Sequence, residues 1–138
     1  MLLADYPLAN ALAVLDAEAN ALLSVDENGA ISVLVSNFPD QLQAMPDLQL
    51  EQSPIGAPQT ALGLPPGGAQ IPSQPVPSGV SLRPSGGALW VTALTGLPFV
   101  VGSAGIVDVS TGSAQPYLGG FTTVIDIEHD IDDATYVL

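Results

Sequence analysis

The stretch VPSGVSLRPSGGALWV, residues 76–91, has the pattern of a strand, a tight turn and a second strand. The stretch FTTVIDIEHDIDDATYV, residues 121–137, follows the same plan further along the chain. Trp90 and Tyr136 occupy matching places near the ends of the two stretches, roughly 45 residues apart, which is the period of a four-stranded propeller blade. Internal repetition of this length predicts an all-β fold.

Further strands complete the repeated unit. Leu12–Asp16 resembles Leu89–Ala93 and supplies a third copy of the second strand. Two more strands are predicted at Gly105–Ser110 and Ala114–Leu118, on either side of a turn at Thr111–Ser113. We therefore predict β-propeller blades of four antiparallel strands, with about two to three blades present.

The chain divides into four territories under this interpretation. Residues 1–38 form a partial first blade, 39–79 a Pro/Gly-rich connection, 80–121 a second blade and 122–138 the start of a third. Closed propellers use about four to eight blades, so we expect a fragment of a larger propeller, with missing blades or self-association covering its open faces.

Local signals refine the first two territories. Ala21–Val25 and Ala30–Val35 are predicted to pair as a hairpin around Asn28–Gly29, because both turn residues tolerate positive φ. No charge occurs from Gln52 to Gly79, a region rich in proline and glycine, and this predicts a long, largely irregular or polyproline-like connection. Gln41–Ala44 has room for one helical turn.

The charge balance excludes some partners. The chain has 14 acidic residues and Arg83 as its only Lys or Arg, so nucleic acid and anionic membrane surfaces are not expected partners. Cysteine is absent, which excludes disulfides and thiolate chemistry. The uncharged span Ala88–Val107 has the length of a membrane helix, but Gly96 and Pro98 interrupt it, and two strands joined by a loop are predicted. Val100–Val101, like Ile106–Val107, is predicted to be strand sequence buried on both faces.

Several segments also resemble one family. The sequence is similar to the ScyD/ScyE family of bacterial and cyanobacterial proteins in four places: Ala17–Gly29, Val76–Val80, Leu94–Phe99 and Gly120–Ile127. Thr-Gly-Leu-Pro-Phe at 95–99 is the most specific of these elements. The chain departs from the family pattern at Ala93–Leu94 and at Asp132–Asp133.

The resemblance implies an exported, extracellular or periplasmic, six-bladed propeller similar to NHL-repeat and gluconolactonase-like proteins. The resemblance does not settle the activity. Because the sequence shows no intact set of metal ligands, we expect a non-enzymatic binding or interaction module, with an unknown ligand or protein at the propeller face. The alternative is a metal-dependent, lactonase-like hydrolase, in which Glu18, Asn20 and Asp126 would be the residue types that hold a divalent metal.

Candidate sites are few. The predicted binding loop consists of Thr95, Gly96, Leu97, Pro98 and Phe99. The alternating carboxylates of Glu128, Asp130, Asp132 and Asp133 suggest Ca²⁺ or another divalent metal, but the glycine and the distal bidentate Glu of a calcium loop are missing. A solvated turn that binds no cofactor is therefore the favoured interpretation.

Catalytic residues are not predicted. His129 lacks a partner Ser or Cys in a recognisable arrangement and is interpreted as a turn histidine.

Overall fold

The computed structural model describes residues 10–36, 38, 40–47, 59–96 and 99–138. The elements are β1 (Ala11–Asp16), β2 (Ala21–Asp26), β3 (Ile31–Ser36), β4 (Gln41–Ala44), the short 3-10 helix η2 (Gln59–Leu62), β5 (Gln70–Ser73), β6 (Pro75–Leu82), β7 (Leu89–Thr95), β8 (Ala104–Asp108), β9 (Gln115–Phe121), β10 (Ile127–His129) and β11 (Thr135–Val137).

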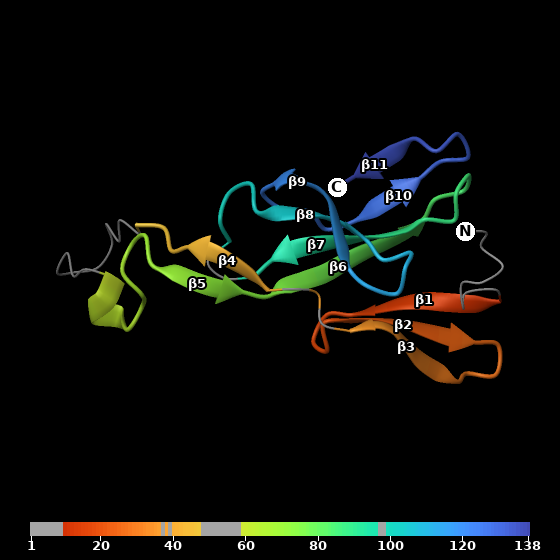
Figure 1. The fold of residues 1–138 in the computed structure, drawn as a ribbon, viewed down its shortest axis with the longest axis horizontal. Helices are drawn as coiled ribbons and strands as arrows, with labels where there is room; N and C mark the ends of the chain where they lie inside the picture. Colours follow the sequence, from red (N-terminus) through yellow and green to blue (C-terminus); the bar gives the residue numbers. More distant parts are fainter. Residues whose placement is uncertain (1–9, 37, 39, 48–58, 97–98) are drawn as a thin grey trace.

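The strands form antiparallel sheets, and the predicted all-β class is confirmed. Their orders are β1-β2-β3, β4-β5, β6-β7-β8-β9 and β10-β11. Figure 1 shows the four-stranded sheet in the middle, with β1–β3 on one side of it and β10–β11 on the other, while β4 and β5 extend away as an arm.

Within the central sheet β6–β9, strand β7 is buried on both of its faces. Leu89 and Val91 of β7 point to one side, where they join a cluster that includes Leu22 of β2. Trp90, which alternates with them, points to the other side and packs with Ile127 of β10. Because successive side chains of a strand face opposite ways, β7 requires a neighbouring sheet on each side.

Two predicted hairpins are confirmed. β2 and β3 pair around Asn28–Gly29, where Gly29 has φ 80°. β6 and β7 pair around the turn that follows Leu82, with Ser81 opposite Trp90. The predicted strands on either side of Thr111–Ser113 are also present, as β8 and β9.

The second copy of the repeat is shorter than predicted. The 121–137 stretch was expected to begin with a strand like that of the 76–91 stretch, but β10 covers only Ile127–His129. Tyr136 consequently lies opposite Glu128 and is 59% exposed, whereas Trp90 is 6% exposed. Shared position in the repeat therefore does not give the two aromatic side chains the same burial.

The segment that leads into β10 lies close to β6, and its backbone makes the contact. The Ser78 hydroxyl donates a hydrogen bond of 2.9 Å to the Val124 carbonyl. Next to it, a Cβ atom on Gly79 would lie 2.7 Å from Cα of Asp126, so only glycine allows this approach.

The prediction of an irregular connection is wrong for its last part. β5 and most of β6 lie between residues 70 and 79, and the prolines there are compatible with strand structure. β6 is an edge strand, where Pro75 and Pro77 are tolerated because an edge strand has one unpaired side, and the register shifts between Pro77 and Gly79. The helical turn predicted at Gln41–Ala44 is also wrong, since this segment is β4 and pairs with β5.

The span Ala88–Val107 forms two strands joined by a loop, as predicted. Within the described residues, no helix is long and apolar enough to cross a membrane. Ile106 and Val107 are buried on opposite faces of β8, but Val101 lies outside any strand and is 80% exposed. The expected burial of Val100–Val101 on both faces is therefore wrong.

The buried Trp90 provides a test of sheet stacking. Replacing Trp90 by Ala should lower the free energy of unfolding by about 3–5 kcal/mol, because the large side chain fills the space between two sheets. Leu42→Ala is the control, since Leu42 is 73% exposed and its truncation should cost less than about 0.5 kcal/mol. Denaturant titration followed by circular dichroism would measure both, and equal stability of the two variants would contradict the stacking.

Candidate functional site

The acidic segment forms the turn between β10 and β11. The Asp130 carboxylate accepts hydrogen bonds from the backbone N–H groups of Asp132 and Ala134, each at 2.9 Å. It also accepts one from the Tyr136 hydroxyl at 3.1 Å. The same pattern occurs in the β2–β3 turn, where Asp26 accepts from the N–H groups of Asn28 and Ala30. Asp130 therefore acts as a turn-forming residue.

Asp133 takes the left-handed position that Gly29 occupies in the β2–β3 turn. Its φ is 63°, a conformation that Asp adopts more readily than most residues. Its carboxylate accepts a hydrogen bond of 3.0 Å from the N–H of Ser85 and lies 3.7 Å from Nε of Arg83. The two turns, β6–β7 and β10–β11, are thereby joined.

The four carboxylates predicted as metal candidates do not converge. Asp130 and Asp133 are engaged in turn contacts, while Glu128 and Asp132 are exposed. Across the described parts of the chain, no group of three or more His, Asp or Glu side chains is arranged to hold a metal ion.

Hydrogen bonding shifts two pKa values in this turn. The N–H of Ala134 is the largest cause that lowers the pKa of Asp130 below its usual value of 3.8, and the Tyr136 hydroxyl and the N–H of Asp132 add to it. The pKa of Tyr136 is raised above 10.0, first by its hydrogen bond to Asp130 and then by the negative charge of that carboxylate. The hydrogen bond is therefore strongest in the pH range in which Asp130 is charged and Tyr136 is neutral.

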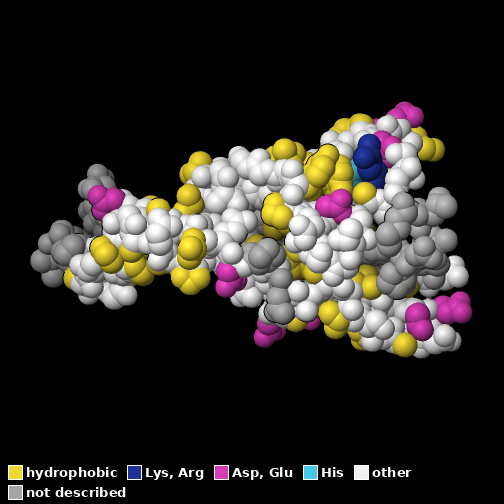
Figure 2. All heavy atoms as spheres, in the orientation of Figure 1, with side chains coloured by type: hydrophobic (Ala, Val, Ile, Leu, Met, Phe, Trp, Pro, Cys, Tyr) yellow, Lys and Arg dark blue, Asp and Glu magenta, His cyan; other side chains and the backbone are white. Residues whose placement is uncertain are grey.

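Aromatic and cationic side chains surround Trp90. The ring of Tyr117 lies with its centroid 4.2 Å from that of Trp90, and the His129 ring makes an edge contact at 5.0 Å. Arg83 lies over Trp90 at 5.7 Å, within the range of a cation–π interaction. Figure 2 shows this arginine, in dark blue, beside the histidine in cyan.

His129 is not the turn histidine that was predicted. It is the last residue of β10 and is 7% exposed. Its Nδ1 atom is hydrogen-bonded to the Ser81 hydroxyl at 2.8 Å, which links β10 to β6. Its role in this structure is packing and hydrogen bonding between sheets.

The predicted binding loop follows β7. Thr95 is buried, and its hydroxyl is hydrogen-bonded to that of Ser103 at 2.8 Å, across the base of the loop. The N–H of Gly96 donates to the carbonyl of Gln74 at 3.1 Å. Phe99 has φ 56° and is 55% exposed. The other two predicted members, Leu97 and Pro98, lie outside the described residues.

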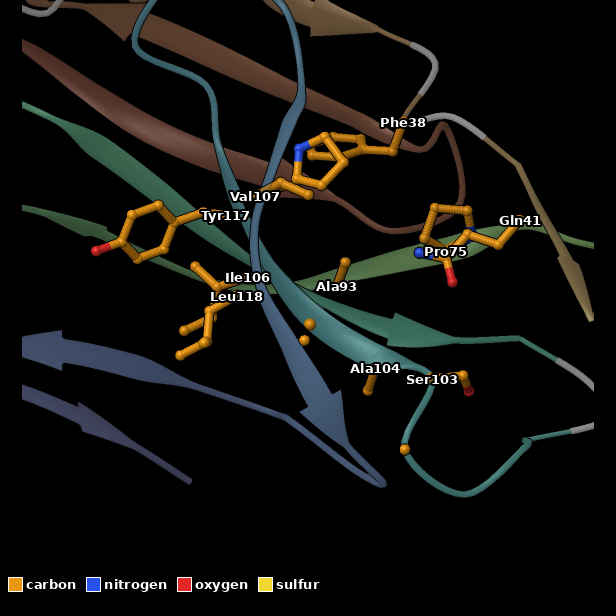
Figure 3. A pocket seen from close by; sticks show the side chains of 14 residues that line it. Phe38, Gln41, Pro75, Ala93, Ser103, Ala104, Ile106, Val107, Tyr117 and Leu118 are labelled. Carbon is orange, nitrogen blue, oxygen red and sulfur yellow. The ribbon is translucent and has the colours of Figure 1, made fainter.

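A cavity of about 320 Å³ lies next to the base of this loop (Figure 3). Gly102 and Ser103 line it where the loop enters β8, and the strand residues on one wall include Ile106. Phe38, which follows β3, contributes an aromatic ring, and Tyr117 of β9 is also a lining residue, although its ring packs on Trp90. The lining is mostly apolar, and the volume lies within the range of small-molecule sites.

Sequence reasoning did not identify Phe38 or Tyr117 as members of a site. Tyr117 has no direct partner in the β8–β9 register, which passes from Leu118 to Pro116 where it shifts between Ile106 and Val107. Such a bulge redirects a side chain and cannot be located from the alternation of residues alone. Phe38 reaches the cavity only through the tertiary packing of the first sheet.

Two of the three residues considered for a lactonase-like metal, Asn20 and Asp126, form local hydrogen bonds. Asn20 has φ 49° and is buried, and its Nδ2 atom is 3.4 Å from the Phe38 carbonyl. Asp126 accepts a hydrogen bond from the N–H of Ile127, and Glu18 is exposed in the β1–β2 turn.

Comparisons of this chain with protein-family models, with curated proteins and with solved structures found no match. The ScyD/ScyE resemblance therefore stays a prediction.

The coupling between Asp130 and Tyr136 predicts two pH effects. A carboxylate with a lowered folded-state pKa stabilises the fold above its unfolded pKa, so this contribution should be lost as the pH falls below about 4. A tyrosine with a raised folded-state pKa stabilises the fold below about pH 10, and its contribution should be lost at higher pH.

Asp130→Asn tests this coupling without removing the side chain. The variant should lower the pKa of Tyr136, because the negative charge next to the phenol is gone. Ultraviolet titration of phenolate, with Tyr136→Phe identifying the contribution of Tyr136, would measure the change. An unchanged Tyr136 titration would contradict the hydrogen bond.

Calcium should change little in this chain. The Asp130 carboxylate is directed to backbone donors and that of Asp133 to Ser85 and Arg83, so calorimetric titration should show no binding tighter than about the millimolar range. Micromolar affinity that disappears in Asp130→Asn would contradict this prediction.

Proposed function

We propose that this chain is part of a β-propeller of the ScyD/ScyE type and serves as a binding module. The stacked order of its sheets supports this proposal. The sheet β6–β9 has the four antiparallel strands of a blade, and neighbouring sheets cover both of its faces. The ScyD/ScyE resemblance adds the expectations of six blades and of export from the cell.

The observation that carries the binding function is the apolar cavity beside the 96–103 loop. Phe38 supplies aromatic surface, and Gly105 and Gly119 leave room along the wall formed by β8 and β9. A mostly apolar cavity of this size suits a small apolar ligand or an apolar side chain of a protein partner. The loop then lies where it can contact the rest of that ligand, through the exposed ring of Phe99.

Binding of this kind needs no reacting group from the protein. The polar atoms of the loop base are used to hold the loop, as in the hydrogen bond between Thr95 and Ser103. We therefore assign recognition, and not chemistry, to this cavity.

Filling the cavity should abolish ligand binding. Gly119 lines the cavity, and a Cβ added there meets no atom within 4 Å, so Gly119→Val should place methyl groups in the space without a backbone clash. Nile red, a neutral apolar dye, is a suitable probe because the protein has a formal net charge of -13. Its dissociation constant should rise by about tenfold or more in Gly119→Val.

Gly86→Val is the matched control. Gly86 lies in the β6–β7 turn outside the cavity lining, and a Cβ there also meets no atom within 4 Å. Fluorescence titration of the two variants and the parent would decide the proposal. Equal dye affinity in Gly119→Val and Gly86→Val would contradict a binding site in this cavity.

A further inference from the structure

The first sheet carries a continuous aliphatic face on the side away from β6–β9. The β1–β2–β3 register places Leu12, Val25 and Ile31 in one cross-strand row. A second row consists of Val14, Leu23 and Val33. Leu12, Ile31 and Val33 are 70%, 66% and 62% exposed, which is unusual for three aliphatic side chains on one sheet face.

The internal repeat indicates what such a face contacts. Val14 of β1 corresponds to Val91 of β7 and to Val137 of β11. Val91 is buried against the sheet that precedes its own, β1–β3, and Val137 packs against the sheet that precedes its own, β6–β9. Val14 faces in the equivalent direction, and no described sheet of this chain precedes β1–β3.

The opposite end of the stack shows the complementary situation. Ala13, Trp90 and Tyr136 correspond in the repeat. Ala13 packs toward the sheet that follows, β6–β9, and Trp90 packs toward β10–β11. Tyr136 points in the same sense but is 59% exposed, with Glu128 opposite it on the same face of β10–β11. Inside the chain, one sheet face packs on the next between β1–β3 and β6–β9 and again between β6–β9 and β10–β11. The outer face of β1–β3 and the outer face of β10–β11 correspond to the two sides of this contact, and both are exposed.

From this arrangement we propose that copies of this chain associate head to tail. The aliphatic face of β1–β3 of one copy packs on the Tyr136 face of β10–β11 of a second copy, and this continues the stacking of sheets within each chain. This inference rests on the stack of sheets that also supports the proposed function. A contact between unlike faces either closes into a ring or extends as a filament.

Charge opposes this association and gives it a measurable signature. Each copy has a formal net charge of -13, so two copies repel one another at low ionic strength. Raising the salt concentration from about 0.02 M to about 0.5 M shortens the screening length from roughly 20 Å to about 4 Å. Association should therefore become tighter with salt, whereas an association driven by ion pairs would become weaker.

Light scattering coupled to size-exclusion chromatography tests the aliphatic face. Val33→Asp should raise the dissociation constant by about tenfold or more, because it places a charge on the aliphatic face. Leu42→Asp is the matched control, with the same added charge at an exposed position on β4, outside this face. Thermal melts of both variants would confirm that each remains folded.

Cysteine cross-linking tests the direction of the contact, and the chain has no cysteine of its own to interfere. Chains carrying Val14→Cys should form disulfides with chains carrying Tyr136→Cys when the two are mixed, because Val137 and Trp90, their counterparts in the repeat, pack in one cluster. Disulfides formed only between two Val14→Cys chains would overturn the proposal, since they indicate a symmetric dimer. A monomer at every salt concentration would also overturn it, and would mean that another segment or a separate blade covers this face. The Nile red assay measures binding in the cavity, which does not involve the outer faces of β1–β3 and β10–β11. The binding proposal and the association proposal can therefore fail separately.

Discussion

The fold depends on the need of β7 to bury both of its faces. Its side chains alternate between two clusters, with Leu89 and Val91 in one and Trp90 in the other, and burying each aliphatic side chain contributes roughly 1.5–3 kcal/mol. A single sheet cannot satisfy a strand of this kind. The first sheet and the β10–β11 hairpin are therefore parts of one cooperative arrangement, in which the central sheet stabilises its two neighbours and is stabilised by them.

Much of this arrangement follows from local sequence. Asn28–Gly29 marks the β2–β3 turn because both residues accept the required backbone conformation, and the 76–91 stretch gives the β6–β7 pairing that the structure has. The repeat also predicts that β1, β7 and β11 are equivalent strands. Prolines led to the main error, because a proline-rich segment was taken to be irregular. Pro75 and Pro77 instead lie on an edge strand, and whether a strand is at an edge depends on the whole sheet.

The candidate site was less predictable than the fold. Thr95 and Gly96 were identified as loop residues, but the structure gives them hydrogen bonds to Ser103 and Gln74 that hold the base of the loop in place. Phe38 and Tyr117 line the neighbouring cavity, and neither had a sequence signal. Phe38 reaches the cavity through contacts between sheets, and Tyr117 reaches it through a register shift in β9. Both are tertiary effects, which a periodic pattern of residues does not contain.

The acidic residues serve this fold mainly through their local geometry. Asp26 and Asp130 form turns of the same kind by accepting backbone N–H groups, and Asp133 joins one turn to the next through Arg83 and Ser85. A carboxylate that is used in this way has few oxygen lone pairs left for a metal ion. The cost of so many carboxylates is mutual repulsion, and the chain has one Arg and no Lys to offset it. Apolar contact between sheets must therefore outweigh charge repulsion wherever the stack is extended, and this is why the aliphatic face of β1–β3 and the charge of the whole chain have to be considered together.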